Sequence, residues 1–437
     1  MSLVSESYTG YQSLKQLSNM KVLYLGNNII RANFGCRATS MALQDIILQQ
    51  HEITSVIYGD ITGRYTPALY KGEIRNSRWS RYMQKFQKKL FRKNSRDEAD
   101  FIRDNVDDSL SGFLMIYTKY PPLENIMHSV EACDALMLNG EGTFIFRQNN
   151  RYDFNFYLFV LTLAQYLNKK TYVLNAMFSD GSASARNISA IEQARKVLTN
   201  CTLVTARDRI SFEEFRENIG DKVEYVPDAL FTWSKYSSYK SIALDYPLAG
   251  VVFPDYDWQW KEFDFSKPYI ALSAGSREIY GNDEEYLQQY IKLVERIKST
   301  YNLVIVQTCG GEEFLKEVAQ QTDTKLIDNS TNILFGMSVL ANAQCYVSGR
   351  WHPSILASLG GTPCVMMKSN SHKSKAIYAE LEYNESETIY NNPPSDDEID
   401  EIMHRIHDAL KIDRTKIQDA AKHKSELCLE QYAKLLK

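Results

Sequence analysis

The sequence predicts an α/β protein with two domains, each built around a parallel β-sheet. Short apolar runs that suit buried strands alternate along the chain with stretches of helical period, and this alternation is typical of parallel sheets. The length of 437 residues exceeds one ordinary core, and two domains of about 200 residues fit the usual size range. Polar and glycine-rich residues also follow several strands, where such sheets bind ligands. We therefore expect two Rossmann-like domains that face a cleft, with helices at the C-terminus.

The chain opens with a strand, a loop and a helix in an N-terminal domain that we place at residues 20–235. The strand is Lys21–Leu25, the loop spans residues 26–35, the helix is Ala38–Gln49, and a second strand follows at Ile53–Tyr58. A loop in this place commonly frames a ligand. It lacks both GxGxxG and GxxxxGK, so a dinucleotide site and a P-loop are weakly supported.

The stretch Lys71–Arg96 is strongly basic. It holds ten lysines and arginines but a single acidic residue. Four apolar residues recur in it at helical spacing, namely Trp79, Met83, Phe86 and Leu90. A basic amphipathic helix of this kind can lie on an anionic membrane surface. The alternative is a solvated helix that packs its apolar stripe on its own domain.

The alternation of strands and helices returns after this insertion. Four more strands are predicted, at Ala135–Leu138, Thr171–Phe178, Leu203–Ala206 and Glu224–Val226, with a helix at Phe156–Leu167. The first strand runs into Asn139–Thr143, which we interpret as a loop at the strand's end. Its glycines would allow close approach of a ligand to the backbone, and Glu141 could orient a hydroxyl. A plain tight turn is the alternative.

A linker and a second domain follow. Residues 236–265 are aromatic-rich and aperiodic, so we interpret them as the linker and part of a cleft wall. The second domain, at residues 266–437, should contain strands at Tyr269–Ser273, Leu303–Gln307, Cys345–Ser348 and Pro363–Met367, and helices at Glu284–Lys298, Asp396–Leu410 and Ile417–Lys437. The loop after its first strand carries a cation, Arg277.

Most of the candidate chemistry lies in residues 344–376. Pro353 suits the first turn of a helix, which places Arg350 and His352 between a strand's end and a helix N-terminus. That position favours anions, and the two side chains would present a fixed cation beside a titratable imidazole. A second polar loop, Ser369–Lys375, follows the next strand in the same way. A capping histidine and a solvated turn are the alternatives.

Composition narrows the class of protein. The seven cysteines are scattered and form no CxxC pair, so neither a disulfide framework nor a cysteine zinc site is supported. The N-terminus lacks the features of a signal peptide, and the longest apolar run, Phe156–Ala164, is far too short to span a membrane. The net charge of −4 implies no general affinity for nucleic acid. We therefore expect a cytoplasmic protein whose contact with membranes is at most peripheral.

Several landmarks, in order along the chain, resemble the polysaccharide pyruvyl transferase family. They begin with the Asn/Gly-rich loop at residues 26–35 and end with the strand-end cation Arg277 and the family's S-x-R-x-H signature at Ser348–His352. Between them lie a Gly-rich run at Asn139–Gly142, an R-D-x-x-S element at Arg207–Ser211 and a P-D-A element at Pro227–Ala229. The resemblance covers roughly Lys21 to Leu381, and the S-x-R-x-H signature is its most specific part.

The resemblance implies a two-domain architecture similar to GT-B glycosyltransferases, with the active site in the cleft. Such enzymes transfer a pyruvyl group from phosphoenolpyruvate to a sugar diol of a surface polysaccharide or its lipid-linked precursor, giving a cyclic ketal. The N-terminal domain would then bind the acceptor and the C-terminal domain the donor. Glu141 stands where the family commonly has glycine, and the insertion Lys71–Arg96 is long and basic; both departures concern the acceptor more than the fold.

Under this resemblance the candidate residues take specific roles. Phosphoenolpyruvate carries a carboxylate and a phosphate, so its site needs planar cations and helix-end amides, and a histidine can supply acid and base. We expect His352 and Arg350 to be catalytic. The expected donor-binding residues are Arg277, Arg350, Ser371, His372 and Lys373. The expected acceptor-binding residues are Asn27, Asn33, Asn139, Glu141 and Asp228. The scheme requires no metal and no cofactor.

Two other functions fit the same features. A GT-B glycosyltransferase would use the cleft for a nucleotide sugar, with Arg350 and the Ser369–Lys375 loop on the diphosphate and Glu380 or Glu382 on the ribose. A non-catalytic protein that binds carbohydrate or lipid-linked glycan would suit the basic stretch and the 12% aromatic content. The sequence does not disclose the acceptor sugar or the oligomeric state.

Overall fold

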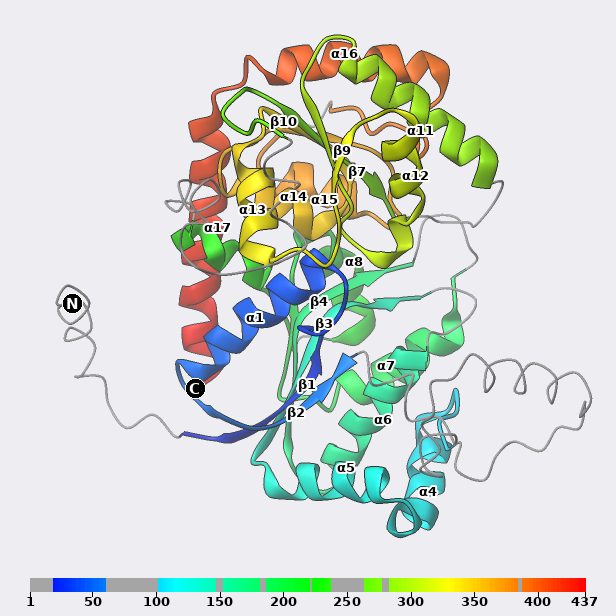
Figure 1. Ribbon diagram of the computed structural model, residues 1–437. Coiled ribbons are helices and arrows are strands. Elements are labelled where there is room, and N and C mark those ends of the chain that lie inside the picture. Colours follow the sequence, from blue (N-terminus) through cyan, green and yellow to red (C-terminus); the bar gives the residue numbers. More distant parts are fainter. Residues whose placement is uncertain are drawn as a thin grey trace, which may run out of the picture.

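The computed structural model describes residues 19–59, 101–146, 152–180, 186–220, 222–236, 263–276, 283–383 and 387–437. The predictions for Lys71–Arg96, for Arg277 and for most of the linker at residues 236–265 therefore concern parts of the chain outside the described residues. Within the described part, two parallel β-sheets lie one above the other, and helices cover both (Figure 1). No helix of the described residues is long and apolar enough to cross a membrane.

The first sheet has six parallel strands in the order β2-β1-β3-β4-β5-β6. Their bounds are Lys21–Asn27 (β1), Glu52–Tyr58 (β2), Ala135–Ile145 (β3), Lys170–Ser179 (β4), Leu203–Ala206 (β5) and Val223–Tyr225 (β6). The central strands β1, β3 and β4 are buried along nearly their whole length, as expected for strands covered by helices on both faces. This explains why they read as continuous apolar runs in the sequence.

Helices cover both faces of this sheet. They are α1 (Phe34–Leu48), α4 (Val106–Ile116), α5 (Pro121–Ala132), α6 (Tyr152–Tyr166), α7 (Ile188–Leu198) and α8 (Arg209–Ile219), with 3-10 turns η2 (Tyr117–Lys119) and η3 (Ala229–Tyr236). The helix α6 is apolar around most of its circumference, and its residues Phe156 and Phe159 are fully buried. Asp208 is the N-cap of α8, because its side chain accepts a hydrogen bond from the Ser211 amide.

The second sheet has five parallel strands in the order β11-β10-β7-β8-β9. Their bounds are Ile270–Gly275 (β7), Leu303–Val306 (β8), Lys325–Ile327 (β9), Cys345–Gly349 (β10) and Cys364–Met366 (β11). Its helices are α11 (Asp283–Lys298), α12 (Phe314–Gln321), α13 (Ile333–Asn342), α14 (Trp351–Ser358), α15 (Lys373–Glu380), α16 (Asp396–Ala409) and α17 (Arg414–Leu435), with the 3-10 turn η4 (Gly310–Glu312). The prediction missed β9, because three residues are too few to show a period.

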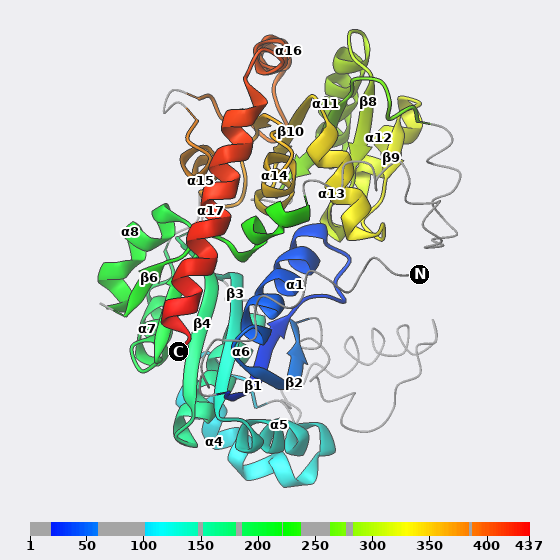
Figure 2. The same cartoon turned by 90° about the vertical axis from the view of Figure 1, so that its left-hand side faces the viewer.

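The helix α1 joins the two sheets. The loop before it pairs with the loop after β8, since the Phe34 amide donates to the Thr308 carbonyl at 2.9 Å and the Gly310 amide to the Ala32 carbonyl at 3.2 Å. Arg37 adds a hydrogen bond to the Asn329 carbonyl at 2.7 Å. Figure 2 shows α1 lying against α13, and apolar residues of both sheets form one core cluster. The carboxyl ends of β1 and β10 are therefore held face to face.

The C-terminal helix α17 runs along both halves of the molecule (Figure 2). It leaves the second sheet and packs on the first, where the Tyr432 hydroxyl lies 3.1 Å from the Thr205 hydroxyl. The His51 Nε2 atom lies 2.7 Å from the Leu436 carbonyl oxygen just past the helix. The expected domain limits, 20–235 and 266–437, stay a prediction, and the described contacts show that the last helix serves both halves.

The prediction of a loop at Asn139–Thr143 is wrong, because these residues lie inside the strand β3. Pairing with β4 continues past the expected strand end, with Asn139 opposite Leu174 and Glu141 opposite Ala176. Gly140 allows this pairing, since a Cβ atom there would lie 2.5 Å from the Ala176 Cβ. The glycine therefore admits a neighbouring strand rather than a ligand.

Candidate active site

A cavity of about 250 Å³ is lined by residues from both halves of the chain. Its lining joins basic, acidic and titratable side chains. The basic ones are Arg31, Arg207, Arg350 and Lys373, the acidic ones are Glu141 and Asp153, and the imidazole is that of His352. Of the predicted site residues, the described cavity includes Asn33, Glu141, Arg350, His352 and Lys373. The remaining ones, apart from Arg277, lie behind or beside it.

Arg350 precedes α14 and is held by a buried carboxylate. Its Nε donates to the Glu312 Oε1 at 2.7 Å and its NH1 to the Ser276 hydroxyl at 2.8 Å. The other oxygen of Glu312 accepts from the Thr308 amide at 2.6 Å and the Cys309 amide at 3.2 Å. Burial lowers the pKa of the Arg350 guanidinium, but the adjacent Glu312 outweighs it, so that pKa lies above its ordinary value. A fixed cation thus faces the cavity.

His352 lies in the first turn of α14 with one ring nitrogen engaged from behind. Its Nε2 atom is 3.2 Å from the Asp228 Oδ2 and 3.1 Å from the Arg207 NH1. A protonated Nε2 can donate to Asp228, and a bare Nε2 can accept from Arg207. The imidazole thus has a partner in either protonation state, which is the property that an acid–base group needs.

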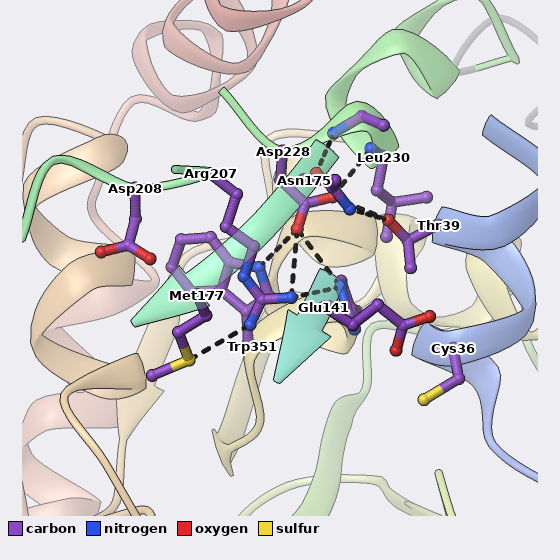
Figure 3. Close-up of polar contacts among 12 residues, drawn as sticks. Cys36, Thr39, Glu141, Asn175, Met177, Arg207, Asp208, Asp228, Leu230 and Trp351 are labelled. Atoms are coloured by element: carbon purple, nitrogen blue, oxygen red, sulfur yellow. Dashed lines mark hydrogen bonds and ion pairs between the residues drawn. The ribbon is translucent and has the colours of Figure 1, made fainter. Parts of the chain in front are cut away.

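Asp228, predicted to bind the acceptor, does not line the cavity. It is fully buried behind His352. Its Oδ1 accepts from the Thr39 hydroxyl at 3.0 Å and the Leu230 amide at 2.9 Å, and its Oδ2 accepts from the Trp351 indole at 2.8 Å (Figure 3). Burial raises the pKa of Asp228, but His352, Arg207 and the Trp351 hydrogen bond lower it further, so the pKa lies well below its usual range. Asp228 is an ionised group that orients the imidazole.

Arg207 is a lining residue that the prediction did not assign to the site. Its side chain is almost fully buried, with NH2 3.4 Å from the Met177 sulfur and the guanidinium 5.1 Å from the Trp351 ring centroid. Its Nε has no hydrogen-bond partner among the described residues. The R-D-x-x-S element of the sequence contained this residue, but nothing local indicated that its first arginine would reach a histidine 145 positions away.

Glu141 faces the cavity from the second half of β3, and its carboxylate accepts hydrogen bonds from two side-chain amides and a hydroxyl. Its Oε1 accepts from the Asn28 Nδ2 at 2.7 Å, the Asn139 Nδ2 at 3.0 Å and the Ser40 hydroxyl at 3.3 Å. Asn139, predicted to bind the acceptor, is instead buried in this frame. Asn27, predicted for the same role, is buried outside the cavity lining, and its Nδ2 donates to the Gln44 side chain at 3.1 Å.

Only part of the Ser369–Lys375 loop reaches the cavity. Lys373 lines it together with Asn370. The predicted donor-binding residues Ser371 and His372 do not, because they face the first half of the chain: the His372 Nε2 lies 3.1 Å from the Asp208 Oδ1 and 3.2 Å from the Ser211 hydroxyl. Burial raises the pKa of Asp208, but the His372 contact lowers it more, so that it lies below its usual value. These residues join the two halves.

Two more polar residues of the lining come from the loop at residues 26–35, which the prediction singled out as a ligand loop. They are Asn28 and Arg31. The Arg31 guanidinium donates to the Gly59 carbonyl at 3.3 Å and lies 3.9 Å from the Asp153 carboxylate. The sequence position of the loop was informative, but the identity of the side chains that turn inward depends on its conformation.

The amino end of α14 opens onto this cavity. Arg350 occupies its N-cap position and no side chain caps the helix there. Trp351, His352 and Pro353, the first residues of the helix, all line the cavity. An uncapped helix N-terminus beside guanidinium groups is a favourable place for an anion.

The residues expected to hold a ribose do not reach the cavity. Glu380 is fully buried, and both of its oxygens are occupied: Oε1 by the Arg209 amide at 2.9 Å and Oε2 by the Tyr225 hydroxyl at 2.5 Å and Lys424 at 2.8 Å. Glu382 lines a different groove. The acidic ribose-binding residue that we expected of a nucleotide-sugar enzyme, Glu380 or Glu382, is therefore missing from the described cavity. Among the described residues, no group of three or more His, Cys, Asp and Glu could hold a metal ion.

Comparisons with known proteins place this geometry in context. Residues 33–371 match the model of a family described as polysaccharide pyruvyl transferase. No curated protein matches the chain.

Solved structures that share the architecture are distant in sequence. A UDP-GlcNAc 2-epimerase from Neisseria meningitidis is 14% identical, with a TM-score of 0.54 over 94% of this chain and 100% of that one. A putative UDP-N-acetylglucosamine 2-epimerase from Listeria monocytogenes is 10% identical, with a TM-score of 0.52 over 93% and 91%. An Anabaena protein in complex with UDP and glucose is 13% identical, with a TM-score of 0.52 over 96% and 99%. At these identities the likeness establishes the GT-B-like fold alone.

Proposed function

The chain belongs to the polysaccharide pyruvyl transferase family, and from this premise we propose that it moves a pyruvyl group from phosphoenolpyruvate to a sugar diol of a polysaccharide or its lipid-linked precursor. One observation carries the choice of donor: Arg207, Arg350 and Lys373 line one cavity with His352. Phosphoenolpyruvate is a compact polyanion with two acidic ends, which such a set of cations and an uncapped helix end would bind.

The net reaction sets what the site must do. Phosphoenolpyruvate and two sugar hydroxyls give a ketal and inorganic phosphate. One hydroxyl proton is balanced by a proton added to the methylene carbon, and the other by the proton on the released phosphate. Positive charge develops at the central carbon when the methylene carbon is protonated, and the bond from that carbon to the phosphate oxygen breaks with its electron pair. The enzyme therefore needs an acid near the methylene carbon and cations around the phosphate.

We assign the role of that acid to His352. Its Nε2 is engaged by Asp228 and Arg207, whereas Nδ1 has no hydrogen-bond partner among the described residues. An imidazolium held by Asp228 through Nε2–H would donate its Nδ1 proton to the methylene carbon. Once neutral, the ring can take a proton from the second hydroxyl, with Arg207 as the donor to a bare Nε2. Asp228 would orient the ring through Nε2 without touching substrate.

Arg350 and Lys373 would bind the departing phosphate and the carboxylate. Arg350 is pre-oriented by Glu312, so little conformational entropy remains to be lost when an anion binds. Its guanidinium lies beside the amino end of α14, where partial positive charge adds to the attraction. A preorganised donor set of this kind stabilises charge that develops in the transition state.

A binding assay tests the donor. Phosphoenolpyruvate, UDP, UDP-galactose and UDP-N-acetylglucosamine are compared by thermal shift on the wild type, on Lys373→Gln and on Arg296→Gln. Arg296 is an exposed residue paired with Asp400 outside the cavity, so it serves as a matched control. A ligand at about 100 times its Kd stabilises the folded state by ~2.7 kcal/mol. We expect phosphoenolpyruvate to stabilise the wild type and the control, and Lys373→Gln to lose most of the shift.

Stabilisation by UDP compounds alone would refute the proposal and favour the glycosyltransferase. Turnover is the second criterion: the wild type should release phosphate from phosphoenolpyruvate when a sugar with a free 4,6-diol is present, and the sugar should gain the mass of the ketal. We choose Lys373→Gln rather than a truncation of Arg350, because removing Arg350 would leave the buried Glu312 charge unpaired and could unfold the protein.

A further inference from the structure

We propose that Glu141 is a second catalytic residue, the base that takes the proton of the attacking acceptor hydroxyl. This inference rests on the proposed function and deepens it, since it names the group on the acceptor side of the same cavity. The observations that carry it are the framing of one carboxylate oxygen, the burial of a carboxylate without an ion pair, and the unusual backbone conformation at this residue.

The frame holds Glu141 by one carboxylate oxygen. Asn28, Asn139 and Ser40 all donate to the same atom, Oε1, at 2.7, 3.0 and 3.3 Å. None of these three donors binds Oε2. The carboxylate is thus fixed in orientation by its Oε1 edge, as a group that must meet a reacting atom needs to be, while the residue lines the cavity.

Glu141 forms no ion pair within the described part of the chain. The side chain is buried, with 6% of the residue exposed, yet no described lysine, arginine or histidine lies within 4.0 Å of its carboxylate. Arg31, the cationic side chain of the neighbouring loop, interacts with the charge of Glu141 from a distance and forms its ion pair with Asp153 at 3.9 Å. Buried carboxylates are costly unless they are paired. A functional role in the cavity accounts for this one.

The backbone at Glu141 points to the same conclusion. Its φ angle is +40°, a left-handed conformation that is uncommon for a residue other than glycine. The pairing of β3 with β4 shifts register between Glu141 and Phe144, and such irregularities re-aim side chains near active sites. Glycine would hold this conformation at no cost. A glutamate here therefore indicates that the side chain is required.

Titratable groups on the neighbouring elements also face Glu141. Tyr24 of β1, Arg31 of the following loop and Cys36 of α1 all interact with its charge. Burial, and then Glu141, raise the pKa of the Cys36 thiol well above its ordinary value, so Cys36 is a neutral hydrogen-bond partner of Glu141. Figure 3 shows the Glu141 carboxylate beside Cys36. The pKa values of Tyr24, Arg31 and Cys36 are all raised, so none of the three competes with Glu141 as a base near neutral pH.

The step itself balances with the donor chemistry. His352 protonates the methylene carbon, and the first hydroxyl attacks the central carbon while its O–H bond breaks and the proton passes to Glu141. Phosphate then leaves with its bonding pair, the second hydroxyl attacks, and its proton returns to His352. The proton on Glu141 leaves with the phosphate. An acid and a carboxylate base on either side of an oxocarbenium-like centre is also how inverting glycosidases divide their proton transfers.

Glu141→Gln tests the assignment, because the amide keeps the shape and an oxygen for the frame. Acceptors are methyl β-galactoside, UDP-galactose and UDP-N-acetylglucosamine, and phosphate release is measured with the one that the wild type converts. We expect kcat to fall by about 10²- to 10⁴-fold, unchanged phosphoenolpyruvate affinity, and loss of the acidic limb of the pH profile. Ser40→Ala is the comparison variant: it keeps the carboxylate but removes a framing hydroxyl, which also accepts from the Asn28 amide at 2.9 Å and the Asn139 Nδ2 at 3.0 Å. Arg296→Gln, outside the cavity, is the matched control and should keep wild-type kcat.

The outcomes separate the two proposals. If Glu141→Gln keeps wild-type kcat, or keeps the acidic limb, Glu141 is not the base even though pyruvyl transfer stands. If Ser40→Ala loses as much activity as Glu141→Gln, the frame and not the carboxylate matters, and the assignment fails. If the wild type neither binds phosphoenolpyruvate nor releases phosphate from it, the proposed function is refuted and this inference with it.

Discussion

Replacing Asp228 by asparagine tests the hydrogen-bond network behind His352. The side chains are nearly isosteric, so Oδ1 can keep the bonds from the Thr39 hydroxyl and the Leu230 amide. The amide nitrogen cannot accept from the Trp351 indole, nor does it offer a negative charge to His352.

The size of the effect on stability follows from these lost contacts. Hydrogen bonds to charged groups contribute ~1.5–3 kcal/mol each, and removing one member of a buried charge pair costs about 3–5 kcal/mol. Asp228 is fully buried and lies 3.5 Å from Arg207, whose guanidinium would lose its only described carboxylate partner. We expect Asp228→Asn to destabilise the fold by about 3–5 kcal/mol, measured by chemical denaturation.

The pH dependence of this loss has a defined sign. The pKa of Asp228 is lowered in the folded state, so its contribution to stability is complete above the unfolded value of about 3.9 and is lost as pH falls through the folded value. The stability deficit of Asp228→Asn should therefore shrink as pH falls below about 4. A deficit that stays the same or grows below about pH 4 would contradict a lowered pKa of Asp228.

A measurement of kcat distinguishes the role of Asp228 in orienting the imidazole from its role in stabilising the fold. Asp208→Asn is a matched control, because Asp208 is also buried, has a lowered pKa and pairs with a histidine, but lies outside the cavity lining. With phosphoenolpyruvate as donor, we expect kcat to fall by about 10²- to 10⁴-fold in Asp228→Asn and by less than about twofold in Asp208→Asn. Equal losses in both variants, or normal kcat in Asp228→Asn, would refute the reasoning.

Three further changes probe other parts of the cavity. Glu312→Gln removes the charge that anchors Arg350. Phosphoenolpyruvate affinity measured by calorimetry should therefore fall by about 10- to 100-fold, which corresponds to about 1.4–2.7 kcal/mol. Unchanged affinity would show that Arg350 needs no anchor. Gly35→Ala places a Cβ atom 2.4 Å from the Cβ of His352, so kcat should fall while donor affinity changes little, and normal turnover would contradict the tight contact. Alkylation of Cys36 by iodoacetamide should be slow at pH 8 and accelerate at higher pH, because burial and a neighbouring carboxylate raise the pKa of its thiol. The rate is measured by mass spectrometry of the alkylated peptide. Fast labelling at pH 7 would contradict the raised pKa.

Much of the fold could be predicted because it depends on local patterns. Continuous apolar runs mark parallel strands such as Leu203–Ala206, which the structure reproduces residue for residue. Proline and glycine marked the start of α14 and its preceding strand end. The same signals placed Arg350 and His352 at a strand-to-helix junction, and the structure places both in the cavity lining.

Local patterns misled where a neighbouring strand decides the conformation. The glycines of Asn139–Thr143 suggested a loop, but pairing with β4 extends β3 through them. The tripeptide Lys325–Ile327 became a strand only because β8 offers it a partner. Strand limits depend on which segments pair, and that is not encoded within the segment itself.

The sequence by itself determined the α/β class, the loop at residues 26–35 and the two residues of the S-x-R-x-H signature. The tertiary structure alone decided how they work together. Asp228 lies 123 positions from Trp351, and Arg207 lies 145 positions from His352, yet all four meet in one buried network. Burial and charge pairing depend on distances in space, and an aspartate on a surface loop and one behind an imidazole are identical in sequence. Folding brought them together and thereby set their protonation and their roles.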